Sequence, residues 1–172
     1  IELWDLSDGA EKRSLDAAMK VLDVRDQNAE EKKGVQNYFS TPPNYAEALL
    51  PLLSAVDKGS SYAAYLLGAM HEYGRGVPVD VHKAIAFYRL GIERGQVSDS
   101  LLSLYQLARA YSKVRDFRQS YLWAALALIG SNETAASAST LLSSVGGQLT
   151  SEQIAESRQR ASDCFARFYR GC

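Results

Sequence analysis

Small and apolar residues recur at helical spacing along most of this chain. In the segment 62–95, the first expected helix carries Ala64, Leu67, Gly68 and His71 at positions i, i+3, i+4 and i+7, which share one face. No run of β-branched residues alternates with polar ones, as a half-buried strand would require. The pattern therefore predicts an all-α protein.

A second helix is expected in the same segment, after a loop at residues 74–79. The glycines of this loop permit backbone angles that other residues avoid, and Pro78 prevents the first helix from continuing. Asp80 is suited to cap the second helix at its start, and Gly95 to end it. The inner face of this helix is expected to hold Ala84, Phe87, Tyr88 and Gly91. Together the two helices form an antiparallel hairpin.

Parts of this hairpin recur at a fixed spacing of 36 residues. Residues 44–48 reappear in pattern as 80–84, Gly59 as Gly95, and Asp80 as Asp116. A period of this size is typical of stacked-repeat proteins. We therefore expect an α-solenoid of stacked antiparallel hairpins, which presents an extended surface suited to binding rather than a reactive cleft.

One segment also carries a family resemblance. The string LGAMHEYGRGVPVDVHKAIAFYRLGIERG, residues 67–95, resembles a SEL-one-like repeat (SLR), a relative of the tetratricopeptide repeat. It departs from the family pattern at His71 where Tyr is usual, at Phe87 where Trp is usual, and at Gly91-Ile92 in place of Ala-Ala. These are substitutions within an expected core. The resemblance implies an SLR/tetratricopeptide-like solenoid that binds other proteins.

We interpret residues 1–172 as a single SLR domain. Its expected parts are an N-terminal cap (1–27), a degenerate repeat (28–59), the best-formed repeat (62–95), a third repeat (98–130) and C-terminal capping helices (131–172). Trp4 is expected to pack on the first repeat as part of the cap. Leu107 lies 40 residues beyond Leu67, so the first helix of the third repeat is expected to begin late, with a loop about four residues shorter. Thr150 and Gln153 form a capping box that starts the final helix.

Charge and hydropathy exclude two classes of partner. The 19 basic and 20 acidic side chains give a formal net charge of −1, whereas nucleic-acid binding needs a basic surface. The longest apolar run, residues 121–129, is about half the length of a membrane-spanning helix. We therefore expect no nucleic-acid partner and no membrane span, and the oligomeric state stays open.

Catalytic and metal-binding signals are weak. His71 and His82 lie on opposite sides of the loop without a third ligand at useful spacing. His71 occupies a packing position, and His82 falls in the first turn of a helix where it is expected to be solvated. No nucleophile–base motif and no phosphate-binding loop is present in the sequence. We expect a protein that is not an enzyme, with no catalytic residues, metal site or cofactor.

Two cysteines, Cys164 and Cys172, lie within the last nine residues. They are either two unrelated thiols or a local disulfide. The tail that they bracket resembles the tail of exported SLR proteins, and this resemblance favours the disulfide and a periplasmic or otherwise exported location. The chain begins at Ile1 without methionine, which fits a cleaved export signal or a trimmed start equally well.

The first helices of a repeat array line its concave side, so the positions between their core residues are expected to face a partner. In the second and third repeats these residues are Tyr62, Tyr65, Ala69, Glu72, Tyr73, Tyr105, Arg109, Ser112 and Lys113. Tyrosine and arginine are favoured anchors in protein interfaces. The alternative is that some of the tyrosines pack between adjacent first helices.

The leading functional hypothesis is a non-catalytic protein-binding module of the bacterial envelope. The resemblance implies more narrowly an immunity protein, because some small exported SLR proteins neutralise secreted antibacterial toxins, including phospholipase effectors of type VI secretion. The array would then block the toxin's catalytic cleft. The alternative is a periplasmic regulator or assembly scaffold. A cell-wall-ligand-binding enzyme is a remote third option, because members of that type carry a cysteine pair in each repeat and this chain does not.

Overall fold

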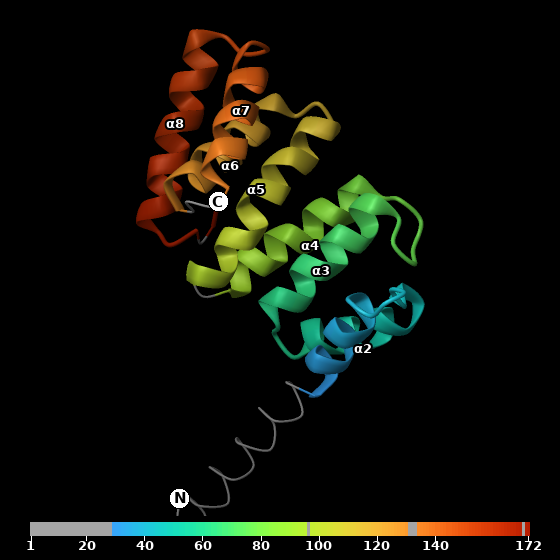
Figure 1. Ribbon diagram of the computed structural model, residues 1–172. Helices are drawn as coiled ribbons and strands as arrows, with labels where there is room; N and C mark the ends of the chain where they lie inside the picture. Colours follow the sequence, from blue (N-terminus) through green and yellow to red (C-terminus); the bar gives the residue numbers. More distant parts are fainter. Residues whose placement is uncertain (1–28, 96, 131–133, 170) are drawn as a thin grey trace, which may run out of the picture.

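Helices follow one another along the chain and pair as antiparallel hairpins (Figure 1). The computed structural model describes residues 29–95, 97–130, 134–169 and 171–172. A helical segment at 29–38 precedes α2 (Tyr45–Asp57), α3 (Ser61–Tyr73), α4 (Val81–Arg94), α5 (Val97–Lys113), α6 (Phe117–Gly130), α7 (Ala135–Gly146) and α8 (Ser151–Ala166). The described residues contain no strand, and the predicted all-α class is confirmed.

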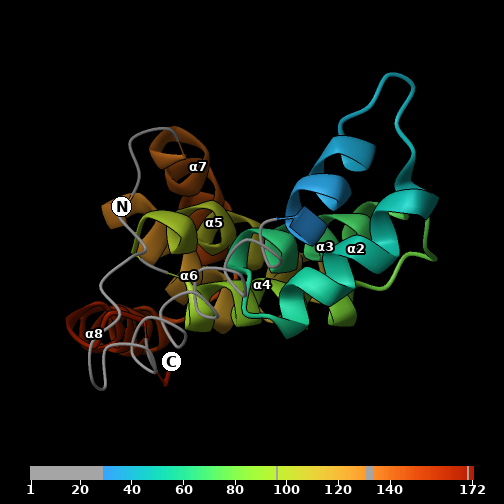
Figure 2. The same cartoon turned by 90° about the horizontal axis from the view of Figure 1, so that it is seen from below.

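The hairpins stack side by side as a solenoid does. Within the hairpins, α3 packs on α4 and α5 on α6, while α4 also packs on α5. The first helices α3, α5 and α7 touch in succession, and α6 packs on α8 in the second layer. Figures 1 and 2 show this succession from α2 to α8 in two views. The expected solenoid is therefore confirmed, whereas the predicted cap at 1–27, with Trp4, lies outside the described residues.

Side-chain caps start the helices where the sequence predicts them. The carboxylate of Asp80 accepts a hydrogen bond from the Lys83 amide at 3.0 Å and caps α4. Thr150 and Gln153 form the reciprocal capping box at the start of α8. Gly95 follows α4 as its C-cap, in an extended rather than a left-handed conformation.

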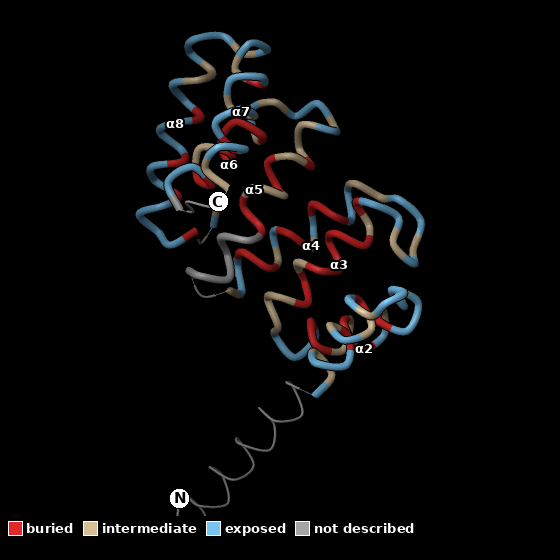
Figure 3. The backbone as a smooth tube through the Cα atoms, in the orientation of Figure 1, coloured by how far each residue is buried: buried red, intermediate tan, exposed pale blue. Residues whose placement is uncertain are grey.

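The core lies between the hairpins, where the buried stretches of α3, α4 and α5 face one another (Figure 3). Leu67 and Ala84 are fully buried, as the repeat pattern predicts. Gly68 lets α4 approach α3 closely, because a Cβ atom there would lie 2.5 Å from a ring carbon of Tyr88. His71 is partly buried and stacks on Phe87 with ring centroids 5.5 Å apart.

The hairpin of α5 and α6, which we interpret as the third repeat, differs from the prediction at its first helix. α5 begins at Val97, 36 residues after the start of α3 at Ser61, so this helix does not begin late. It instead runs further at its C-terminal end, and residues 114–116 replace the longer loop at 74–80. The shortened loop is as expected, and Arg115 takes the left-handed conformation that glycines provide in the second repeat. The helix is longer by as many residues as the loop is shorter, so the 36-residue spacing is preserved.

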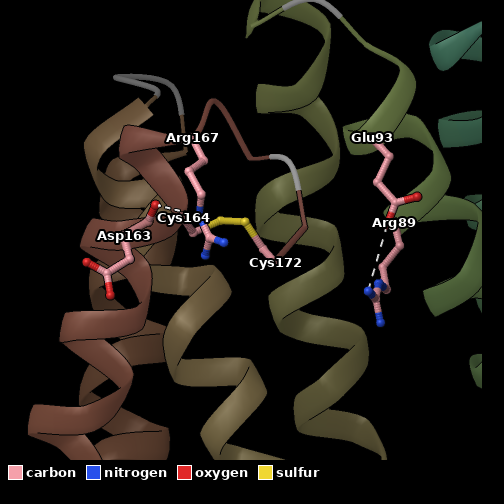
Figure 4. Close-up of a disulfide and its surroundings, with 6 residues drawn as sticks. All are labelled: Arg89, Glu93, Asp163, Cys164, Arg167 and Cys172. Carbon is pink, nitrogen blue, oxygen red and sulfur yellow. Dashed lines mark hydrogen bonds and ion pairs between the residues drawn. A yellow bond between two sulfur atoms is a disulfide. The ribbon is translucent and has the colours of Figure 1, made fainter.

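A disulfide between Cys164 and Cys172 closes the C-terminal end (Figure 4), and the predicted pairing is present. The two Cα atoms are 5.6 Å apart, within the ordinary range for a disulfide. Cys164 is buried in α8, and the chain turns back through Phe168 and Tyr169, which both have positive φ. Tyr169 is buried against the same core cluster as Cys164. The disulfide therefore holds the turn against the last helix.

Removing this disulfide through Cys172→Ser is expected to lower the free energy of unfolding by about 2 kcal/mol, because the reduced chain gains conformational freedom when unfolded. Cys172 is the better position to change, since Cys164 is buried and its replacement would also disturb packing. Urea denaturation under non-reducing conditions measures the effect. Reduced wild-type protein is the matched control and should lose about the same amount. Equal stability of oxidised and reduced wild-type protein would contradict the prediction.

Candidate functional site

A shallow depression of about 240 Å³ opens between the N-terminal hairpins. We call it the tyrosine groove, and it is lined by Tyr38, Phe39, Tyr65, Leu66, Ala69, Tyr73, Arg75, Tyr88 and Gln106. These residues come from the segment around helix 29–38, from α3 and its following loop, and from α4 and α5. The groove therefore joins residues of three successive helical hairpins.

Glu72 contradicts the expectation that it faces a partner. Its side chain is fully buried, and its carboxylate receives charged or polar donors from two other helices. The hydroxyl of Tyr88 on α4 donates to Oε2 at 2.7 Å. Arg109 on α5 donates through Nε and Nη2, at 3.1 and 2.9 Å, and the Nζ of Lys113 lies 2.9 Å from Oε1. Glu72 thus links α3, α4 and α5.

This carboxylate is charged in the folded protein. Burial alone would raise the pKa of Glu72, but the hydrogen bonds from Arg109, Lys113 and Tyr88 outweigh burial and lower the pKa. Burial raises the pKa of the Tyr88 hydroxyl, and the adjacent negative charge of Glu72 raises it further. Each carboxylate oxygen is therefore paired with two donors, which is the arrangement that a buried anion requires.

Ala69 was expected to face outward as well, and it is buried at the floor of the groove. The reason is the same for Ala69 and Glu72. α3 lies against α2, α4 and α5, so a wider arc of its surface is covered than one face of an amphipathic helix. The expected outward positions of α3 therefore belong in part to the core.

Tyr73 remains accessible, with 44% of its surface exposed. Three cationic groups surround its ring, at 5.0 Å for Arg75, 5.2 Å for Arg109 and 5.0 Å for the ammonium of Lys113. Arg109 also donates a hydrogen bond to the hydroxyl of Tyr73. These cation–π contacts fix an aromatic anchor at the edge of the groove.

The other predicted contact residues are partly exposed. The rings of Tyr62 and Tyr65 stack at 6.0 Å, and Tyr65 also lies 6.2 Å from the ring of Tyr88. Tyr105 lies beside Arg109, whose guanidinium is 5.9 Å from its ring centroid, and Ser112 is also half-buried. These contacts lie within α3 and between α3 and α4. Packing of the tyrosines between adjacent first helices stays a prediction.

Sequence reasoning missed five residues of the groove: Tyr38, Phe39, Leu66, Arg75 and Gln106. Tyr38 ends a helix whose repeat pattern is degenerate and Phe39 follows it, so no register indicated which way they point. Arg75 lies in the glycine loop, to which we assigned only a structural role. The signal that could have found it is its position between Gly74 and Gly76, both with positive φ, which turn the loop back toward the first helices.

The histidines do not form a site with other ligands. His71 packs on Phe87, and burial lowers its pKa, while His82 is exposed. Within the described ranges, no cluster of three or more His, Cys, Asp or Glu side chains could hold a metal ion. No described helix is long and apolar enough to cross a bilayer.

The architecture defines an α-solenoid of helical hairpins whose exposed groove is aromatic and cationic. Comparison with protein families identifies its central unit, because the Sel1 repeat model matches residues 61–96, which contain α3, α4 and the glycine loop. The expected SEL-one-like repeat is confirmed for this part of the chain. Sel1 repeats are protein–protein interaction modules, which implies a protein partner. The sequence matches no curated protein.

Proposed function

We propose that this protein is a non-catalytic binding module that holds a partner protein against the tyrosine groove. The observation that carries the proposal is the exposed Tyr73 ring with Arg75 and Arg109 beside it. Aromatic and arginine side chains bury a large area while keeping polar tips, and they dominate the energy of many protein interfaces. The Sel1 repeat that contributes most of the groove supports the same role.

We further propose that the module acts in the bacterial envelope as an immunity protein. A disulfide persists in oxidising compartments, which supports an exported location. The partner would be a secreted antibacterial toxin, such as a phospholipase effector of type VI secretion, whose catalytic cleft the solenoid covers. The resemblance of the cysteine-bracketed tail to that of exported members supports this role. A periplasmic regulator or scaffold is the alternative, and the identity of the captured partner distinguishes the two.

Capture of envelope proteins by the immobilised full chain, followed by mass spectrometry, tests the proposal. Tyr65→Ala is expected to weaken capture by about 2 kcal/mol, because it removes an aromatic anchor from the groove. Arg109→Ala is unsuitable here, since it would leave the buried Glu72 carboxylate without its bidentate partner.

Leu50→Ala is the control, because Leu50 is an exposed apolar side chain on α2 that does not line the groove. It should capture as much partner as the wild-type protein. Equal capture by the Tyr65→Ala protein would show that the groove is not the binding site. If the chain captures no protein in any form, the proposed function itself is wrong.

A further inference from the structure

We propose that Arg75 is a receptor for a carboxylate, and that the tyrosine groove therefore selects an acidic segment of its protein partner. This inference rests on the proposed function and specifies the chemistry of the partner. The segment would place an Asp or Glu side chain on Arg75 and a neighbouring apolar side chain in the groove.

The charges around the groove do not balance. Arg75, Arg109 and Lys113 all lie within about 5 Å of the Tyr73 ring, and Glu72 is the carboxylate that pairs with two of them. Among the described residues, these three positive groups and one negative group leave a local charge of +2, although the whole chain has a net charge of −1. The surplus is therefore local to the groove, which suits an acidic segment better than an extended polyanion.

Arg75 contributes to this surplus of positive charge because it has no acidic partner among the described residues. Among the described residues, no carboxylate lies within ion-pair distance of its guanidinium. Its side chain donates a hydrogen bond to the hydroxyl of Tyr38 and lies 5.7 Å from the centre of that ring. Its other neighbours are also aromatic, at 5.8 Å for Tyr45 and 5.0 Å for Tyr73.

Some described arginines are already paired with a carboxylate, whereas Arg158, like Arg75, donates to a tyrosine hydroxyl, that of Tyr121. Arg89 pairs with Glu93 one turn away, and Arg118 pairs with Glu156, although both are more exposed than Arg109. A guanidinium carries five N–H donors in a planar fork that matches a carboxylate with two parallel hydrogen bonds. Arg75 therefore retains the capacity to bind an acidic side chain, and the rings around it limit the freedom that binding would cost.

The backbone holds Arg75 in this position. Gly74 and Gly76, on either side, have φ values of +68° and +71°, which side-chain-bearing residues rarely adopt. The loop also packs closely on α2, because a Cβ atom at Gly76 would lie 2.7 Å from the Cβ of Tyr45. The glycine signature of the repeat thus directs an arginine toward the groove, beyond its role in connecting two helices.

Beside Arg75 the groove offers apolar contact. Leu66 and Ala69 line it together with the rings of Tyr65 and Phe39. A volume of about 240 Å³ suits one or two side chains rather than a folded domain. An extended segment with an acidic residue next to an apolar or aromatic one fits both parts of the surface.

Selection from a random peptide library on the immobilised full chain tests the inference. Selected peptides are expected to be enriched in Asp and Glu beside an apolar residue. Synthetic versions should bind Arg75→Gln about tenfold or more weakly, because one charge-assisted contact is lost. The affinity of Arg75→Lys for the peptides should lie between those of the wild type and Arg75→Gln, because lysine keeps the positive charge but lacks the planar fork of N–H donors.

Arg89→Gln is the matched control, because it removes one positive charge from an arginine that pairs with Glu93 and does not line the groove. Its affinity for the peptides should equal that of the wild-type protein, and rising salt should weaken binding to the wild type more than to Arg75→Gln. Thermal melting of each variant checks that it folds.

Peptides without acidic enrichment, peptides that bind Arg75→Gln as tightly as the wild type, or a selection that yields no binder would each overturn the inference. The proposed function can fail separately. If Arg75→Gln captures the same envelope protein as strongly as the wild type, the module binds proteins without a carboxylate receptor. If the wild type captures nothing, the proposed function fails as well.

Discussion

Replacing Glu72 with alanine is expected to destabilise the folded protein by about 3–5 kcal/mol, which is the usual cost of removing one partner from a buried ion pair. Glu72 accepts hydrogen bonds from Arg109 on α5 and Tyr88 on α4, and it also pairs with Lys113. Without the carboxylate, the Tyr88 hydroxyl is buried without an acceptor and the two cations repel each other. The packing of α3 against α5 should weaken first.

Urea denaturation measures this effect, with two variants for comparison. Glu72→Gln keeps the size of the side chain and removes its charge, so it should cost less than Glu72→Ala. Lys113→Ala removes a partner whose side chain is 41% exposed, and it should cost about 1 kcal/mol or less. A Glu72→Ala protein as stable as Lys113→Ala would show that the ion-pair cluster does not hold the repeats together.

Acid provides a second measure of the same group. The pKa of Glu72 is lowered in the folded protein, so the unfolded chain takes up a proton first as the pH falls. The stabilisation from Glu72 is therefore complete above the ordinary glutamate pKa of about 4.3 and is lost as the pH falls toward its folded pKa. In the Glu72→Ala protein, stability should change less across this window.

The hairpin fold could be predicted because its signals are local. The Asp80 cap and the glycine loop specify where the helices start and stop within one repeat unit, and the 36-residue spacing indicates that the unit recurs. The buried positions Leu67 and Ala84 follow from the same repeat pattern. The cap, the loop and the buried positions are determined by residues a few positions apart, so the sequence alone indicates them.

The candidate site could be predicted only in part, because its contacts cross repeats. Glu72 and Arg109 are 37 residues apart, as are Tyr38 and Arg75. Helical periodicity places a residue on a face of its own helix but does not show which neighbouring helix covers that face. Glu72, two residues before the loop, was therefore expected to face a partner, although a tyrosine and two cations of other helices enclose it.

Gly68→Ala is the second change with a large expected effect, a loss of about 3 kcal/mol of unfolding free energy. The new Cβ would lie 2.5, 2.6 and 3.0 Å from three ring atoms of Tyr88. That ring is fully buried, and its hydroxyl is held by Glu72, so it cannot move aside without losing a hydrogen bond. We therefore expect a loss of stability in the upper part of the range usual for inserting an extra methyl group into a well-packed core.

Alanine substitutions at two further glycines distinguish the effect of packing on stability from the effect of helix propensity. A Cβ at Gly91 would lie 3.1 Å from both the Ser103 hydroxyl and the Ser61 carbonyl oxygen, whereas at Gly146 the nearest atom is 3.5 Å away. Propensity alone predicts that alanine stabilises a helix by about 1 kcal/mol relative to glycine. Packing predicts instead that Gly68→Ala is the most destabilised of the three proteins, Gly91→Ala is intermediate, and Gly146→Ala is close to or above wild type. Urea midpoints that rank Gly68→Ala at or above the wild type would show that close approach of α3 and α4 does not require this glycine.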